Sequence, residues 1–285
     1  MSGPSAALVI HALEMGAIGV VAATIGSLAG LGGGFLVAPI LRIVFGLPPD
    51  VAAATSLVLV FANVASASVA FVRQGRVDLR LALPMGLLAI PGSIAGAYAV
   101  KFAPAAWFDL MYAAMLLGFA IDIVRRGSQT ATGAIARLPW GVLRTFHDRV
   151  SGVDFTYVES PPIAAGAGVA TGFLSSFFGI GGGILVVPLL LRVFAMPAHI
   201  VSATSHMIIL FSAPFGVAAH AYQGDINWAD ALPLAAGGLI GGQLGASVSR
   251  RLSGVVLVRL LATVLIVAAL SLVIQHVDAL FGARH

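Results

Sequence analysis

Two runs of consecutive glycine, each embedded in apolar sequence, are the stretches of this chain best suited to binding an anion. They are GLGGGFLVAP at residues 30–39 and GIGGGILVVP at 179–188, with the triplets Gly32, Gly33 and Gly34, and Gly181, Gly182 and Gly183. Three glycines in a row interrupt a helix, because each costs about 1 kcal/mol of helix stability and permits backbone angles closed to other residues. The helix that starts after the break offers unpaired N–H groups and the positive end of its dipole. We name the two triplets the glycine knots.

Glycine also serves close helix packing, which small residues four positions apart favour in membranes. Gly92 and Gly96 have that spacing, as do Gly241 and Gly245, and we expect them to pack against neighbouring helices. The knots differ because a helix break in lipid survives only inside the protein or beside a water-filled cavity. They are therefore predicted to line a cavity, with close packing as the alternative.

Hydroxyl side chains follow each knot at the same distance. AATS at residues 53–56 and SATS at 202–205 supply Thr55, Ser56, Thr204 and Ser205. These hydroxyls either replace part of the hydration shell of an oxyanion or cap the helices that start after Pro48 and Pro197. Asn63 extends the polar face of the first copy at helical spacing. The predicted substrate-binding residues are thus the two knots with Thr55, Ser56, Asn63, Thr204, Ser205 and His206.

His206 directly follows the second Thr-Ser pair, whereas Leu57 holds the corresponding place in the first copy. Histidine changes its charge between about pH 5 and 8, so His206 is a candidate for carrying a coupled proton or for switching anion affinity. The alternative is a neutral packing residue held by a hydrogen bond. An ion pair of Asp122 with nearby Arg125 and an interfacial position for His220 are also expected.

Composition places these residues in a membrane. The chain is 59% hydrophobic and 9% charged, which excludes an ordinary soluble domain. Its apolar stretches are continuous rather than alternating, so they predict an all-α polytopic membrane protein. About eight to ten hydrophobic segments are expected, at 8–30, 34–46, 50–72, 79–100, 104–124, 162–178, 183–195, 200–222, 228–249 and 254–275. The chain has no cysteine and no metal-ligand motif, and neither a metal nor a cofactor is expected.

The chain is an internal duplication. With an offset of 149 residues, 22 of the 69 positions from 32 to 100 are identical to those from 181 to 249. Charge indicates that the copies are inverted, because the loop with Arg73, Arg76 and Arg80 corresponds to a loop with Asp225 and Asp230. We therefore expect two inverted-topology repeats with broken or re-entrant helices at the knots. Each repeat crosses an odd number of times, either five times or three times plus a hairpin.

The predicted units are a first transmembrane repeat at 1–125, a cytoplasmic connector at 126–160 and a second repeat at 161–285. Arginines concentrate in the connector, so the positive-inside rule places it in the cytoplasm and both termini outside. A short interfacial helix is expected at RLPWGVLRTFHDRV, residues 137–150.

Three function classes remain open on the residues alone. An intramembrane enzyme is disfavoured because Ser205 and His206 are adjacent and point about 100° apart on a helix, so no catalytic residue is assigned. A secondary transporter and an anion channel or uniporter without coupling would both use these features. Partners predicted for the transporter are a small anion, the lipid bilayer and protons, with no nucleic acid; a homo-oligomer is left open.

The paired GxGGGxxxxP motifs, each followed by ATS about 15 residues later, resemble the TauE/SafE sulfite exporter family, also called the TSUP or DUF81 permeases. The resemblance implies a bacterial or archaeal inner-membrane permease for sulfite, sulfonates or related small organic anions, with proton coupling. The positions that match the motif are Gly30, Gly32, Gly33, Gly34, Pro39, Thr55, Ser56, Gly179, Gly181, Gly182, Gly183, Pro188, Thr204 and Ser205. Exact substrate and transport direction do not follow from it.

Overall fold

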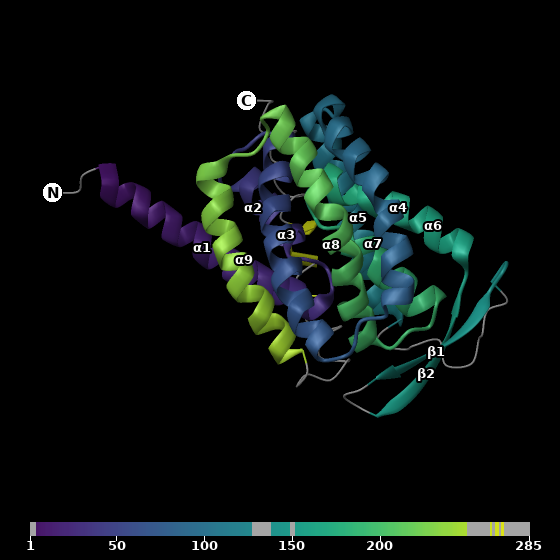
Figure 1. Cartoon of the computed structure of the whole chain (residues 1–285). Helices are drawn as coiled ribbons and strands as arrows, with labels where there is room; N and C mark the ends of the chain where they lie inside the picture. The colour runs from purple at the N-terminus through teal and green to yellow at the C-terminus, as the bar shows by residue number, and fades with distance from the viewer. Residues whose placement is uncertain are drawn as a thin grey trace.

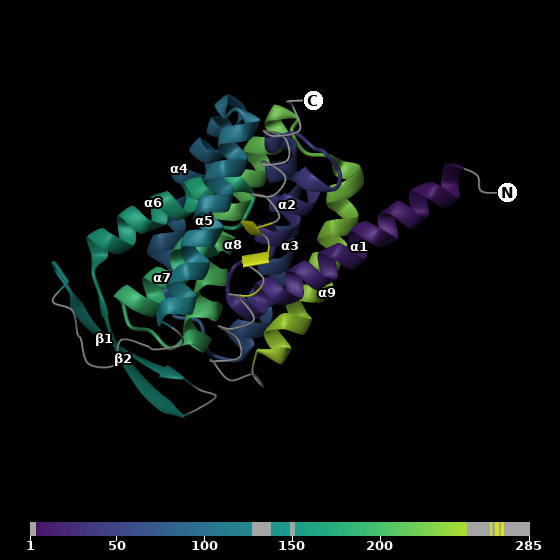
Figure 2. The ribbon, with the colours of Figure 1, turned by 180° about the vertical axis from the view of Figure 1, so that it is seen from behind.

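The computed structural model describes residues 4–126, 138–148 and 152–249, together with residues 263, 266, 267, 269 and 270. Its elements are α1 (Pro4–Ala29), α2 (Gly34–Ile43), α3 (Pro49–Arg73), α4 (Leu79–Ala99), η1 (Val100–Phe102), α5 (Ala105–Arg126), β1 (Val142–Asp148), β2 (Val153–Glu159), α6 (Pro161–Phe178), α7 (Gly183–Pro188), η2 (Leu189–Val193), α8 (Ala198–Gln223) and α9 (Trp228–Val248). The helices form a bundle with the β1–β2 hairpin at one end, and the first turns of α1 project from its side (Figure 1). Figure 2 shows the same projection from behind.

Within the described residues, six helices are long and apolar enough to cross a membrane. They lie in α1, α3, α4 with η1, α5, α8 and α9. Their outer faces carry exposed apolar side chains such as Leu87 on α4 and Ile240 on α9, which suit contact with lipid. The predicted all-α polytopic membrane protein is confirmed. The expected last segment, 254–275, lies almost wholly outside the described residues.

The two short helices begin at the glycine knots. Helix α2 has 10 residues and starts after Gly33, and α7 starts after Gly182 and continues into the π-helical turn η2. At 1.5 Å per residue α2 covers about 15 Å, roughly half of the hydrocarbon thickness. The knots therefore break the helices, as the sequence predicted.

The long helices pack across the two halves of the chain. Helix α1 lies against α9, and its counterpart α6 lies against α4. Glycine permits both contacts: a Cβ on Gly92 or Gly96 would collide with carbonyl groups of α6, and one on Gly241 or Gly245 with carbonyl groups of α1. The predicted packing role of these four glycines is confirmed.

Equivalent hydrogen bonds fix the directions of the central helices. The backbone N–H of Asn227, before α9, donates to Thr55 near the start of α3 (3.1 Å), and the N–H of Asp78, before α4, donates to Thr204 near the start of α8 (3.2 Å). Because α9 follows α8 directly and α4 follows α3 directly, each of α3 and α8 starts where the other ends. Helices α3 and α8 therefore run antiparallel.

The connector contains a β-hairpin where an interfacial helix was expected, and that expectation is wrong. Strands β1 and β2 pair antiparallel, with Thr145 opposite Thr156. Alternating β-branched and aromatic residues, as in VDFTYVE, favour a pleated strand once a partner strand is available. The hairpin is fixed to the bundle by Tyr157, which donates to Asp78 (2.5 Å), and by Arg76, whose Nε lies 3.6 Å from Asp148.

Candidate functional site

The backbone of both knots has a conformation that favours glycine. The φ angles are 79° at Gly30, 85° at Gly32 and 85° at Gly33, and 69° at Gly179, 84° at Gly181 and 71° at Gly182. Other residues rarely adopt these left-handed angles. The chain thus leaves α1 and α6 through a left-handed turn and enters α2 and α7 through a left-handed N-cap.

The two knots lie directly against each other at the centre of the bundle. A Cβ on Gly34 would collide with the carbonyl oxygen of Gly179, and a Cβ on Gly183 would lie 2.5 Å from the carbonyl oxygen of Gly30. All six knot glycines are buried, so the site is closed to solvent in this conformation. The glycines therefore break the helices and allow the two broken ends to touch, as in the close-packing alternative, while a cavity lined by the knots stays a prediction.

Two serine hydroxyls clamp this contact reciprocally. Ser56 on α3 donates to the carbonyl of Gly179 (2.8 Å), and Ser205 on α8 donates to the carbonyl of Gly30 (2.8 Å). Each serine also reaches a carbonyl of its own helix, that of Ala53 or Ser202. The serine of each half thus holds the glycine two residues before the knot of the other half, and both hydroxyls are engaged with backbone.

Thr55 and Thr204 are not at the knots. Each accepts a backbone N–H at the start of a neighbouring long helix, as described above, and both are fully buried. Asn63 does reach the first knot: its amide donates to the carbonyl of Gly32 (2.9 Å) and accepts from Ser27 (2.7 Å). The predicted polar residues therefore position the knots and the helix starts.

His206 is fully buried on α8. Its Nδ1 donates to the carbonyl of Ser202 (2.8 Å), and its ring packs edge-on against Phe71, with centroids 5.3 Å apart. Among the described residues its Nε2 has no hydrogen-bond partner. A neutral His206 with the proton on Nδ1 presents an unshared lone pair at Nε2, and a second proton there would create a donor.

Comparison with known proteins gives the family. Residues 15–272 match the family described as sulfite exporter TauE/SafE. The chain belongs to this family. It is 30% identical over 267 residues to the probable membrane transporter protein YunE of Bacillus subtilis, a match that covers 91% of this chain and 96% of that protein.

Other relatives carry the same description. A probable membrane transporter protein of Xylella fastidiosa is 29% identical over 245 residues, covering 85% of each chain. One of Methanocaldococcus jannaschii is 32% identical over 180 residues, covering 61% of this chain and 59% of that protein. No solved structure matches the chain. This TauE/SafE protein is therefore a multi-pass membrane transporter and not an enzyme.

Two hydroxyls near the second knot of this TauE/SafE transporter were missed in the sequence. Thr171 and Ser175, one helical turn apart on α6, are fully buried, and their hydroxyls have no partner among the described residues. Both side chains border the position that a Cβ on Gly182 would occupy. The available signal was the i, i+4 spacing of two polar residues in an apolar helix. The first half has Ala22 and Gly26 at these places.

Two ion pairs involve the short helices. Asp122 on α5 faces Arg192 of η2 (3.6 Å), and Arg42 of α2 pairs with Asp109 of α5 (2.5 Å). Thus both short helices are tied to α5. His220 is fully buried rather than interfacial, because it faces α6 and the turn between α8 and α9.

A cavity of about 580 Å³ lies between the hairpin and the start of α4. It is lined by residues 77–80 and 142–147, which include Arg80 and Arg144. Arg144 pairs with Glu159 of β2, so this cation is already neutralised by an acidic neighbour. The cavity borders Asp78, whose N–H donates to Thr204 near the start of α8. It therefore lies at the end of the bundle where α8 begins.

Proposed function

We propose that this transporter moves a small oxyanion, such as sulfite or an organosulfonate, across the cytoplasmic membrane of a bacterium or archaeon. The observation that carries the proposal is the reciprocal clamp, in which Ser56 holds Gly179 and Ser205 holds Gly30. The clamped carbonyls lie where α1 and α6 end, next to the starts of α2 and α7, and the N–H groups and dipoles of these two helix starts favour a negative charge. The description of the family as sulfite exporters supports the choice of substrate class.

The two halves act as inverted repeats that rock against each other. The antiparallel course of α3 and α8 and the exchange of equivalent hydrogen bonds between the halves support this arrangement. Loops that share a predicted side also meet in space: Lys101 contacts Asp225 at one end, and the hairpin contacts the turn between α3 and α4 at the other. We infer that the hairpin end is cytoplasmic and that the domains are 1–125, 126–160 and 161–285.

Anion binding requires the knots to separate. In the closed contact, Ser56 and Ser205 bond to carbonyl groups, so their hydroxyls become available to an anion only when the clamp opens. Thr171 and Ser175 add two buried hydroxyl donors beside Gly182, and no hydrogen bond among the described residues has to break before they can bind an anion. A protonated His206 would add a third donor at Nε2.

Flux measured in proteoliposomes of the purified protein tests this proposal. Sulfite, sulfoacetate and sulfate are offered with and without an imposed pH gradient. Saturable flux that concentrates one of them when protons are driven supports a coupled carrier. Flux that only dissipates gradients favours the channel or uniporter, and absence of flux for all three contradicts the oxyanion proposal.

A further inference from the structure

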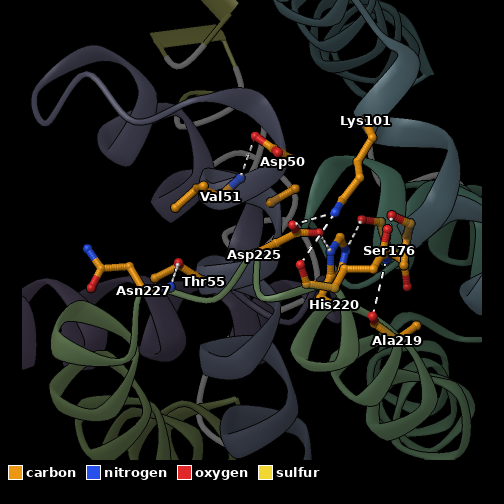
Figure 3. Close-up of polar contacts among 12 residues, drawn as sticks. Asp50, Val51, Thr55, Lys101, Ser176, Ala219, His220, Asp225 and Asn227 are labelled. Atoms are coloured by element: carbon orange, nitrogen blue, oxygen red, sulfur yellow. Dashed lines mark hydrogen bonds and ion pairs between the residues drawn. The ribbon is translucent and has the colours of Figure 1, made fainter.

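We propose that His220 and Asp225 bind an exchangeable proton at the end of the bundle opposite the hairpin, and that this proton ties α6 to the turn between α8 and α9. The inference rests on the proposed function in one respect: it names where the proton that drives anion movement binds. Figure 3 shows the residues concerned, which come from α6, η1, α8 and that turn.

Both ring nitrogens of His220 face acceptors. Nε2 lies 3.0 Å from the carbonyl oxygen of Ser176, and Nδ1 lies 3.4 Å from Oδ2 of Asp225. The His220 side chain is fully buried, and 6% of the Asp225 side chain is exposed. Water therefore has little room to replace either contact.

A proton count follows from this geometry. A carbonyl oxygen only accepts, so Nε2 must carry a hydrogen. In a neutral imidazole Nδ1 then holds a lone pair, which would face the negative carboxylate without a hydrogen between them. One more proton, either on Nδ1 or on the Asp225 carboxyl, turns this repulsive contact into a hydrogen bond. The contact between His220 and Asp225 is therefore a place where one proton can bind.

The surrounding charges allow the proton to bind and to dissociate. Lys101 of η1 lies 2.9 Å from Oδ1 of Asp225, and Asp50 at the start of α3 also acts electrostatically on His220. Helix α6 contributes no titratable side chain, and Tyr98 near this end of α4 is 44% exposed. With Lys101 pairing the carboxylate, the site keeps a partner for Asp225 after the proton leaves.

Other histidines that contact aspartate do not need a second proton. His11 faces Asp230 through Nε2, and His147 faces Asp154 through Nδ1, both at 2.7 Å. The described structure gives each of these rings one hydrogen-bond partner, so a neutral ring that donates to the carboxylate suffices. The first half has Phe71 in the place of His220, so it has no equivalent of this histidine.

The contact reaches the second knot through α6. Ser176, whose carbonyl bonds His220, lies three residues before Gly179, and its hydroxyl shares a 2.6 Å hydrogen bond with Ser93 of α4. Loss of the proton weakens the link from Asp225 through His220 to this end of α6. The knot that Ser56 clamps is then freer to move, which couples protonation to opening at this end.

Two measurements on the full chain in lipid vesicles test the inference. In the first, nitrogen-15 NMR of histidine-labelled protein follows the imidazoles from about pH 5 to 9, and infrared spectra follow protonated carboxyl groups. We expect one imidazole signal, absent from His220→Gln, to gain its second proton as pH falls, or a carboxylic acid band that Asp225→Asn removes. A neutral His220 beside an ionised Asp225 throughout this range would overturn the inference.

The second measurement is sulfite flux with and without a pH gradient. His220→Gln and Asp225→Asn are expected to reduce the stimulation by the gradient at least about fivefold, the lower range of typical coupling between sites. His147→Gln, which removes an exposed histidine of the hairpin with the same kind of partner, should keep the wild-type stimulation. Wild-type stimulation in both site variants would overturn the inference. If the wild type moves no anion, the proposed function fails, and the spectroscopic result alone decides on the proton site.

Discussion

The hydroxyl of Ser56 donates a 2.8 Å hydrogen bond to the carbonyl of Gly179, a residue of the opposite repeat. Ser205 and Gly30 repeat this relationship in the other direction. The clamp therefore joins the two halves at the point where their helices are broken. Its strength sets how readily the knots separate, and this makes the serines sensitive positions for both stability and transport.

Replacing either serine by alanine should loosen the clamp. Ser56→Ala and Ser205→Ala each remove a donor to a buried carbonyl, with an expected loss of about 1–3 kcal/mol in the free energy of unfolding. Sulfite flux should change in both variants. The control is Ser66→Ala on α3, which removes a hydrogen bond to Leu239 from an exposed site and should lose less stability. Equal unfolding temperatures in detergent for the three variants would contradict the clamp.

The contact between the knots predicts a steric effect at Gly183. A methyl group there would lie 2.5 Å from the carbonyl oxygen of Gly30, so Gly183→Ala should destabilise by about 1–3 kcal/mol through overpacking. Gly118→Ala on α5 is the matched control, because its Cβ meets nothing within 4 Å, and it should stabilise by about 0.5–1 kcal/mol. The unfolding temperatures of the two purified variants, each compared with that of the wild type, measure both effects.

Attachment of the hairpin to the bundle should depend on Tyr157 and should not change with pH near neutrality. Burial, followed by the hydrogen bond to Asp78, raises the pKa of Tyr157 well above its ordinary value. The bond is therefore fully present below about pH 10 and is lost only as pH rises further. Tyr157→Phe should speed hydrogen exchange of the β1 and β2 amides about tenfold, whereas Tyr222→Phe, which is 86% exposed, should not. Unchanged exchange in Tyr157→Phe would show that other contacts hold the hairpin.

The pair Arg42–Asp109 should anchor α2 to α5. Arg42 contacts both carboxylate oxygens, at 2.9 Å and 2.5 Å, and donates to the carbonyl of Leu47 as well. Arg42→Leu leaves Asp109 without its cation and should cost about 3–5 kcal/mol. The double variant Arg42→Leu/Asp109→Leu should recover part of that loss in thermal unfolding. If the double variant instead loses the sum of the two single losses, Arg42 and Asp109 do not stabilise each other.

His206 should affect anion affinity more than proton coupling. In His206→Asn the amide lies at about the position of Nδ1 and can still donate to Ser202, but no group remains at the position of Nε2. If the anion accepts from that nitrogen, its apparent affinity should fall about tenfold, the value of one hydrogen bond to a charged group. Concentration series of sulfite flux measure this. An unchanged affinity would mean that His206 only packs against Phe71.

Several features follow from local sequence and could be predicted. Helix breaks at the knots follow from consecutive glycines, and the packing of Gly92 and Gly241 follows from their spacing. The long apolar segments gave the helices to within a few residues, because membrane helices satisfy their own backbone hydrogen bonds. The β-hairpin was missed because a strand is stabilised by its partner, and the pairing of β1 with β2 is not encoded in either strand alone.

The sequence by itself determined the class of protein, the duplication and the residues of the knots, because composition, periodicity and backbone freedom are local properties. Only the tertiary structure decided what these residues contact. Ser56 meets Gly179 across 123 positions of the chain, and His220 meets Ser176 across 44. Such partners depend on how helices from opposite repeats pack, since a hydroxyl or an imidazole in an apolar helix can turn to any acceptor that packing brings near.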